Sequence, residues 1–180
     1  MTAAAQNLEH RGALEWRVAG RRLVGHAAVF DQAADIGGKR EVIRRGAFAK
    51  ALASGADILA LVDHSPQQLL ARTRSRTLRL AEDARGLSFE IDLPQTSLGS
   101  DILALAERGD LGGASFGFII PKGGERWQGH TRELVEIDLR EISIVHSWPA
   151  YPTTDVAARS RGADRGDVLR TLARLKAEFM

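Results

Sequence analysis

The chain has 180 residues, 44% hydrophobic and 27% charged, which are the proportions of one soluble globular domain. Its net charge of +2 is too small, and its basic residues are too scattered, to indicate nucleic-acid binding. The absence of cysteine excludes a thiol nucleophile, disulfides and thiolate metal sites. No apolar run reaches the roughly 20 residues that span a bilayer, and residues 1–11 lack the apolar region of a signal peptide. We therefore expect a cytoplasmic protein that binds neither nucleic acid nor membrane.

The first half of the chain is predicted to consist of an arm followed by short strands. Residues 1–12 show no apolar periodicity and are expected to be flexible. Alternating or continuous apolar runs bounded by turn residues indicate the strands. The elements expected after the arm are strands over 14–18 and 21–30, a polar loop over 31–45, a helix over 46–54, and strands over 57–62, 69–73, 77–80 and 87–93.

The second half is predicted to add one long helix, more strands and a separate C-terminal segment. A helix from Ser97 to Glu107 is bounded by Gly109. Strands are expected over 114–120, 134–139 and 141–145, with a polar hairpin over 122–130. Many short strands with few helices predict an α+β, mainly β fold: a closed or nearly closed antiparallel barrel surrounded by helices. We expect this domain to span 13–159.

Residues 160–180 are predicted to form a linker and an amphipathic helix. The stripe that would make the helix amphipathic consists of Val168, Leu172, Leu175 and Phe179. Two interpretations stay open: the stripe packs on its own domain, or it docks on another protein. Docking is slightly favoured, because a barrel of this length should close its core without the last helix.

Ser115 is the sharpest chemical signal in the chain. It lies in Gly112-Gly113-Ala114-Ser115-Phe116-Gly117, where small residues allow a substrate backbone to approach a hydroxyl. The backbone N–H groups of Phe116 and Gly117 are candidates for binding a developing oxyanion. A glycine-rich turn into a strand, with a hydroxyl paired only to the backbone, is the simpler alternative. The preceding Ala114 and following strand distinguish the motif from the nucleophile elbow of α/β-hydrolases, which disfavours a small-molecule esterase.

His64 and Glu141 are the candidate partners of this serine. His64 ends a buried strand, where a rigid element could hold a general base, although a histidine in a turn is the simpler interpretation. Glu141 opens a strand and could orient the imidazole. Asp63 ranks lower, because successive strand residues point to opposite faces. The remaining histidines show no metal-ligand spacing, so neither a metal nor a cofactor is predicted.

Five segments, in order along the chain, resemble the prohead proteases of tailed phages. They are residues 25–30, 41–48, 62–64, 113–118, and 141–145 with Pro149-Ala150. The family is related to herpesvirus assemblin, so the resemblance implies an assemblin-like antiparallel barrel. It also implies a Ser115 nucleophile and a His64 base, with Glu141 in place of assemblin's second histidine. The oxyanion arginine of assemblin has no counterpart at Trp148-Pro149-Ala150.

The resemblance further implies a serine endopeptidase that acts inside the assembling procapsid, in the bacterial cytoplasm. Its expected substrates are the scaffold or the N-terminal segment of the major capsid protein, and also the protease itself. Self-association is possible. The alternative is a non-catalytic assembly module that binds scaffold or capsid protein with the same fold.

Overall fold

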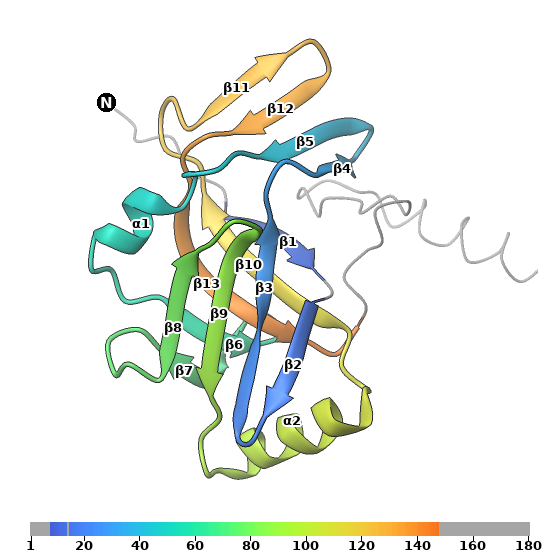
Figure 1. Ribbon diagram of the computed structural model, residues 1–180, viewed down its shortest axis with the longest axis vertical. Helices are drawn as coiled ribbons and strands as arrows, with labels where there is room; N and C mark the ends of the chain where they lie inside the picture. The colour runs from blue at the N-terminus through green and yellow to red at the C-terminus, as the bar shows by residue number, and fades with distance from the viewer. Residues whose placement is uncertain (1–7, 14, 148–180) are drawn as a thin grey trace, which may run out of the picture.

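The computed structural model describes residues 8–13 and 15–147 (Figure 1). The first five strands are β1 (Glu9–Ala13), β2 (Glu15–Ala19), β3 (Arg22–Val29), β4 (Ala33–Ile36) and β5 (Lys39–Ile43). Helix α1 (Ala49–Ala53) precedes β6 (Leu59–Val62), β7 (Ser65–Arg72), β8 (Leu78–Glu82) and β9 (Gly86–Asp92). Helix α2 (Ser97–Arg108) is followed by β10 (Gly113–Ile119), β11 (Glu125–Gln128), β12 (Thr131–Leu134) and β13 (Asp138–Val145). The fold is therefore mainly β, as predicted.

The strands of the described chain form three sheets that do not close into a barrel. Their orders are β1-β10-β13-β6-β7, β2-β3-β9-β8 and β11-β12-β5-β4. The predicted barrel is thus not confirmed. Most strand pairs are antiparallel, as expected, but β13 pairs with β6 and β12 pairs with β5 in parallel. Each parallel pair joins strands that are far apart in the sequence. The periodicity within one strand does not encode which distant strand it pairs with.

The hydrophobic core lies between the first two sheets. In Figure 1, the β2-β3-β9-β8 sheet lies in front of β10 and β13. Alternating apolar residues give each of these two sheets an apolar face toward the core, because every second residue of a strand faces the same side. One core cluster contains Phe89 and Ile91 of β9, Phe116 of β10 and Ile142 of β13, and each of these side chains is at most 1% exposed.

Helix α2 follows the predicted boundaries closely. Thr96 caps its N-terminus, where the Thr96 side chain accepts the Gly99 N–H, and Gly109 ends it in a left-handed conformation at φ 77°. In Figure 1 the helix lies at one end of the sheets, away from the β11–β12 hairpin. No helix of the described residues is long and apolar enough to cross a membrane.

Three predicted segments differ from the structure. Part of the expected arm is strand β1, whose Glu9 and Arg11 form ion pairs and so give no apolar signal. The expected loop over 31–45 contains β4 and β5, joined by a turn at Gly37-Gly38. The expected strand over 134–139 is broken at 135–137, between the end of β12 at Leu134 and the start of β13 at Asp138. The expected C-terminal linker and helix over 160–180 lie outside the described residues.

Candidate active site

Strand β10 carries Ser115 on the face that points away from the core. Ala114, Phe116 and Phe118 face the core, so Ser115 and Gly117 face the other side of the sheet. Ser115 is nevertheless only 6% exposed. Its hydroxyl donates a hydrogen bond of 2.7 Å to the backbone carbonyl of Arg11 in β1.

Strand β13 places two polar side chains on the same face as Ser115. The register pairs Ser115 with Ser143 and Gly117 with Glu141, and directly paired residues share a face. A bulge between the Gly117 and Phe118 pairings leaves Arg140 as an extra residue of β13. Beyond this bulge Leu139 returns to the core, so the irregularity allows a polar row and a buried apolar row to share one strand.

His64 reaches this face from a two-residue turn between β6 and β7. Val62 pairs with Ser65, and the turn residues Asp63 and His64 have φ angles of 47° and 58°. Two successive left-handed residues are typical of a type I′ hairpin turn. A positive φ is uncommon outside glycine, although asparagine, aspartate and histidine adopt it more often than other residues do. The sequence predicted a histidine at the end of a buried strand, and the structure places it in the turn itself.

Glu141 and Ser143 hold His64 at two points. The Nδ1 atom of His64 lies 2.7 Å from Oε1 of Glu141. The Ser143 hydroxyl donates to Oε2 of the same carboxylate at 2.5 Å and accepts the backbone N–H of His64 at 3.1 Å. Ser143 therefore fixes both the carboxylate and the turn that presents the imidazole. Sequence reasoning missed this serine, although its position two residues after Glu141 put it on the same face.

The Glu141 carboxylate is ionised in this setting. Burial raises its pKa, but hydrogen bonds with His10, His64 and Ser143 outweigh burial and hold the pKa at about 2. An ionised carboxylate can only accept hydrogen bonds, so Nδ1 of His64 must be the donor. In the neutral imidazole, Nε2 then keeps its lone pair and can accept a proton.

His10 is the second functional candidate that sequence reasoning missed. We expected it to lie in the arm, but β1 places it opposite Gly117, with its Nδ1 atom 3.3 Å from Oε1 of Glu141. Its ring centroid is 4.0 Å from that of His64. No apolar periodicity in residues 8–13 could have revealed this contact.

His10, His64 and Glu141 are also the one group of described residues with the geometry of a possible metal site. One ligand atom from each lies within 4.8 Å of the others. The three residues come from separate strands and turns, so their spacing in the sequence gave no sign of this grouping. Hydrogen bonding alone already accounts for the arrangement, because each histidine Nδ1 faces an ionised carboxylate.

The other residues considered from the sequence lie elsewhere. Asp63 contacts His146, whose Nδ1 lies 2.6 Å from the Asp63 carboxylate. Phe116 and Gly117 lie inside β10, between register partners on β1 and β13. No hydrogen bond joins Ser115 to His64 among the residues that the structure describes. The site thus brings His64 and Glu141 into contact, with Ser115 on the same face and its hydroxyl held by β1.

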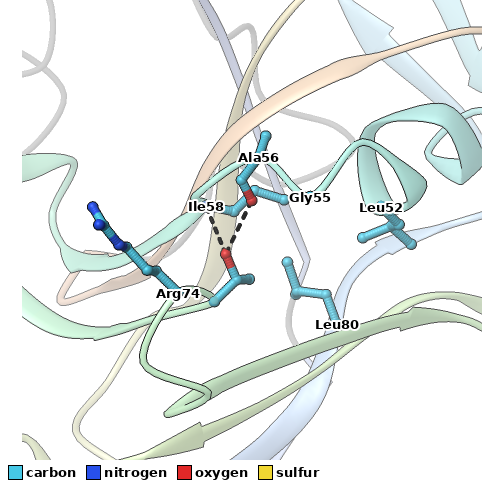
Figure 2. A pocket seen from close by; sticks show the side chains of 7 residues that line it. Leu52, Gly55, Ala56, Ile58, Arg74 and Leu80 are labelled. Carbon is cyan, nitrogen blue, oxygen red and sulfur yellow. Dashed lines mark hydrogen bonds between the residues drawn. The ribbon is translucent and has the colours of Figure 1, made fainter.

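A surface hollow elsewhere in the molecule offers no competing site. It has a volume of ≈ 200 Å³ and lies between the end of α1 and the β7–β8 region (Figure 2). The Thr73 hydroxyl in this hollow accepts the Ile58 N–H and donates to the Ala56 carbonyl, so it is already engaged. None of the residues that line it is a candidate nucleophile or base of the β10–β13 face.

A mainly β chain with a serine, a histidine and a carboxylate on one sheet face contains the residue types of a serine hydrolase. Comparison with protein families is more specific: the model of the caudovirus prohead serine proteases matches residues 11–167. Since this match covers most of the sequence, the chain belongs to that family. Neither the curated proteins nor the solved structures contain a match to it.

Proposed function

We propose that the protein is a maturation serine endopeptidase with Ser115 as nucleophile, His64 as general base and Glu141 as the group that orients His64. The observation that carries the proposal is the 2.7 Å contact between His64 and Glu141 on the sheet face of Ser115. Membership of the prohead serine protease family supports peptide-bond hydrolysis as the reaction. The same membership suggests a role in capsid maturation.

In the proposed reaction, Ser115 Oγ attacks the scissile carbonyl carbon while its proton passes to Nε2 of His64. Glu141 accepts the Nδ1 proton in a hydrogen bond and stabilises the imidazolium that forms. The proton then goes to the leaving amine, which departs and leaves an ester on Ser115. Water hydrolyses that ester with His64 again acting as base. The Phe116 and Gly117 N–H groups are proposed to bind the oxyanion.

We infer that the substrates are the scaffold or the N-terminal segment of the major capsid protein, together with the protease itself. Cleavage would take place inside the procapsid during assembly in the bacterial host. Family membership supports capsid-related substrates in general. We also propose that the protease self-associates and that residues 160–180 contribute to partner binding.

A fluorophosphonate probe tests the chemistry without knowledge of the substrate. The wild-type chain should slowly acquire one adduct, which peptide mass spectrometry should locate on Ser115. The His64→Ala variant should react far more slowly, because the hydroxyl then lacks a base. A non-catalytic assembly module would stay unlabelled while folded, and an adduct on another serine would overturn the assignment of the nucleophile.

A further inference from the structure

Strand β1 covers the candidate nucleophile from the edge of its sheet. Among the strands that the structure describes, β1 ends the order β1-β10-β13-β6-β7 and pairs with β10. Gly12 is the register partner of Ser115, and the Arg11 carbonyl accepts the Ser115 hydrogen bond at 2.7 Å. The hydroxyl therefore already faces a peptide carbonyl, and that carbonyl belongs to the same chain.

In the part of the chain that the structure describes, an incoming substrate strand could pair with β10 only by replacing β1. The opposite edge of β10 is occupied by β13, which itself pairs with β6 inside the sheet. The edge that β1 fills is a terminal edge, the kind that binds extended peptides by strand addition. The residue opposite Ser115 is Gly12, which places no side chain on the face of the hydroxyl.

The side chain of Arg11 is held by carboxylates of β1 and β5. Its Nε and one terminal nitrogen donate to the two oxygens of Glu41 at 2.6 and 2.9 Å. Glu41 is 4% exposed. Arg132 supplies a second cation, 3.0 Å from Glu41, and also binds Glu9 of β1.

Removal of β1 would take Arg11 and Glu9 away together, so the net charge around Glu41 would stay the same. Glu41 would nevertheless lose its two-point partner and keep the contact with Arg132, and a buried carboxylate is costly unless its oxygens are paired. A peptide strand that replaced β1 would restore the two-point contact if it carried an arginine at the same register position. The fork of an arginine fits a carboxylate at two points, which a lysine cannot match.

From these contacts we propose that the edge of β10 that pairs with β1 is the substrate-binding edge. Strand β1 fills this edge in cis, and the edge selects an extended peptide that carries arginine at the position of Arg11. The inference rests on the proposed peptidase role of Ser115 and adds its substrate class and its regulation. The N-terminal segment then competes with substrate for the nucleophile. Release of β1 opens the site.

The test compares full-length chains in which the Arg11 contact is weakened. In Arg11→Ala the strand loses its bond to Glu41, and Glu41→Gln weakens the same bond from the β5 side. Arg22→Ala is the matched control, because Arg22 binds Glu90 and Asp92 on a different sheet. Both test variants should label at Ser115 about tenfold faster than wild type, and the control should not. Thermal melts establish that each variant is folded, and Glu41→Gln keeps the test usable if Arg11→Ala does not fold.

Peptide binding supplies a readout that needs no catalysis. A fluorescent peptide with the sequence of residues 8–14, Leu-Glu-His-Arg-Gly-Ala-Leu, should bind Arg11→Ala and raise its fluorescence anisotropy. The same peptide with alanine in place of arginine should bind at least about tenfold more weakly, a difference equal to one lost charged contact. Glu41→Gln should lose most of this preference.

The outcomes separate this inference from the proposed function. If all folded variants were labelled equally, or if peptide binding showed no preference for arginine, the proposal that β1 occupies the substrate edge of β10 would be overturned. The proposed peptidase function would not be affected. Arginine-dependent peptide binding without any labelling of Ser115 would support the proposed binding edge and contradict the proposed peptidase function.

Discussion

Gly117 of β10 and Glu141 of β13 are register partners, and the carboxylate of Glu141 lies over the space that a side chain at position 117 would need. A Cβ built on Gly117 would collide with Oε1 of Glu141 and approach Cε1 of His10 to 3.0 Å. The glycine therefore makes room for the contact between the carboxylate and both imidazoles.

We expect Gly117→Ala to displace Glu141 and lower the rate of peptide cleavage by about 10²-fold, the scale of a misplacement of about 1 Å in an active site. A double-mutant cycle checks the cause. In a Glu141→Gln background, the added alanine should cost much less, because the interaction it disturbs is already impaired. Additive losses in the cycle would show that Gly117 acts by another route.

Neutralisation of Glu141 should lower the cleavage rate much more than neutralisation of Asp63. Glu141→Gln removes the anion that fixes the Nδ1 proton, and a comparable change in another serine protease lowers kcat by about 10⁴. Asp63→Asn alters only the contact with His146 and should change the rate by less than about tenfold. Single-turnover cleavage rates of the two purified variants compare them. The opposite ranking would make Asp63 the orienting carboxylate.

The low pKa of Glu141 makes stability depend on pH. Its folded-state value of about 2 lies below the ordinary 4.5, so its stabilisation is fully present above about pH 4.5 and is lost as the pH falls toward 2. The difference between 4.5 and about 2 corresponds to about 3 kcal/mol. Denaturant unfolding of wild type and Glu141→Gln should therefore converge as the pH is lowered through this window. A constant gap between the two would refute the depressed pKa.

Ser143 should matter for both stability and catalysis. Ser143→Ala removes a donor to the buried carboxylate and the acceptor of the His64 N–H, so we expect a loss of about 1.5–3 kcal/mol in unfolding free energy. The cleavage rate should fall as well, because the turn that carries His64 loses a support. Ser88→Ala is the control, since Ser88 donates to a backbone carbonyl of β8 at the surface. Wild-type cleavage kinetics in a folded Ser143→Ala variant would exclude a positioning role.

The sequence predicted those parts of the fold that local chemistry controls. The alternation of Leu87, Phe89 and Ile91 identified β9, and Gly109 marked the end of α2. Ser115, His64 and Glu141 could be selected because glycines, a strand end and a family resemblance surround them. Contacts between strands were harder, since parallel pairing of β13 with β6 depends on long-range register rather than on periodicity.

Strand β1 shows why the rest was missed. Glu9 and Arg11 are partly buried through ion pairs, whereas periodicity analysis looks for apolar residues. A strand stabilised by Glu41 and Arg132 therefore has the same local sequence character as a flexible arm. With β1 unrecognised, the position of His10 beside His64 could not be foreseen either.

The most direct test of the central claim is cleavage of the capsid protein by chains that differ only at Ser115. The wild-type protein and Ser115→Ala are each co-expressed with the major capsid protein and its scaffold, and intact masses are then measured. We predict shortened capsid or scaffold chains with the wild type and none with Ser115→Ala, whose circular dichroism and melting curve should stay close to wild type. Equal cleavage by the folded Ser115→Ala variant would contradict the account.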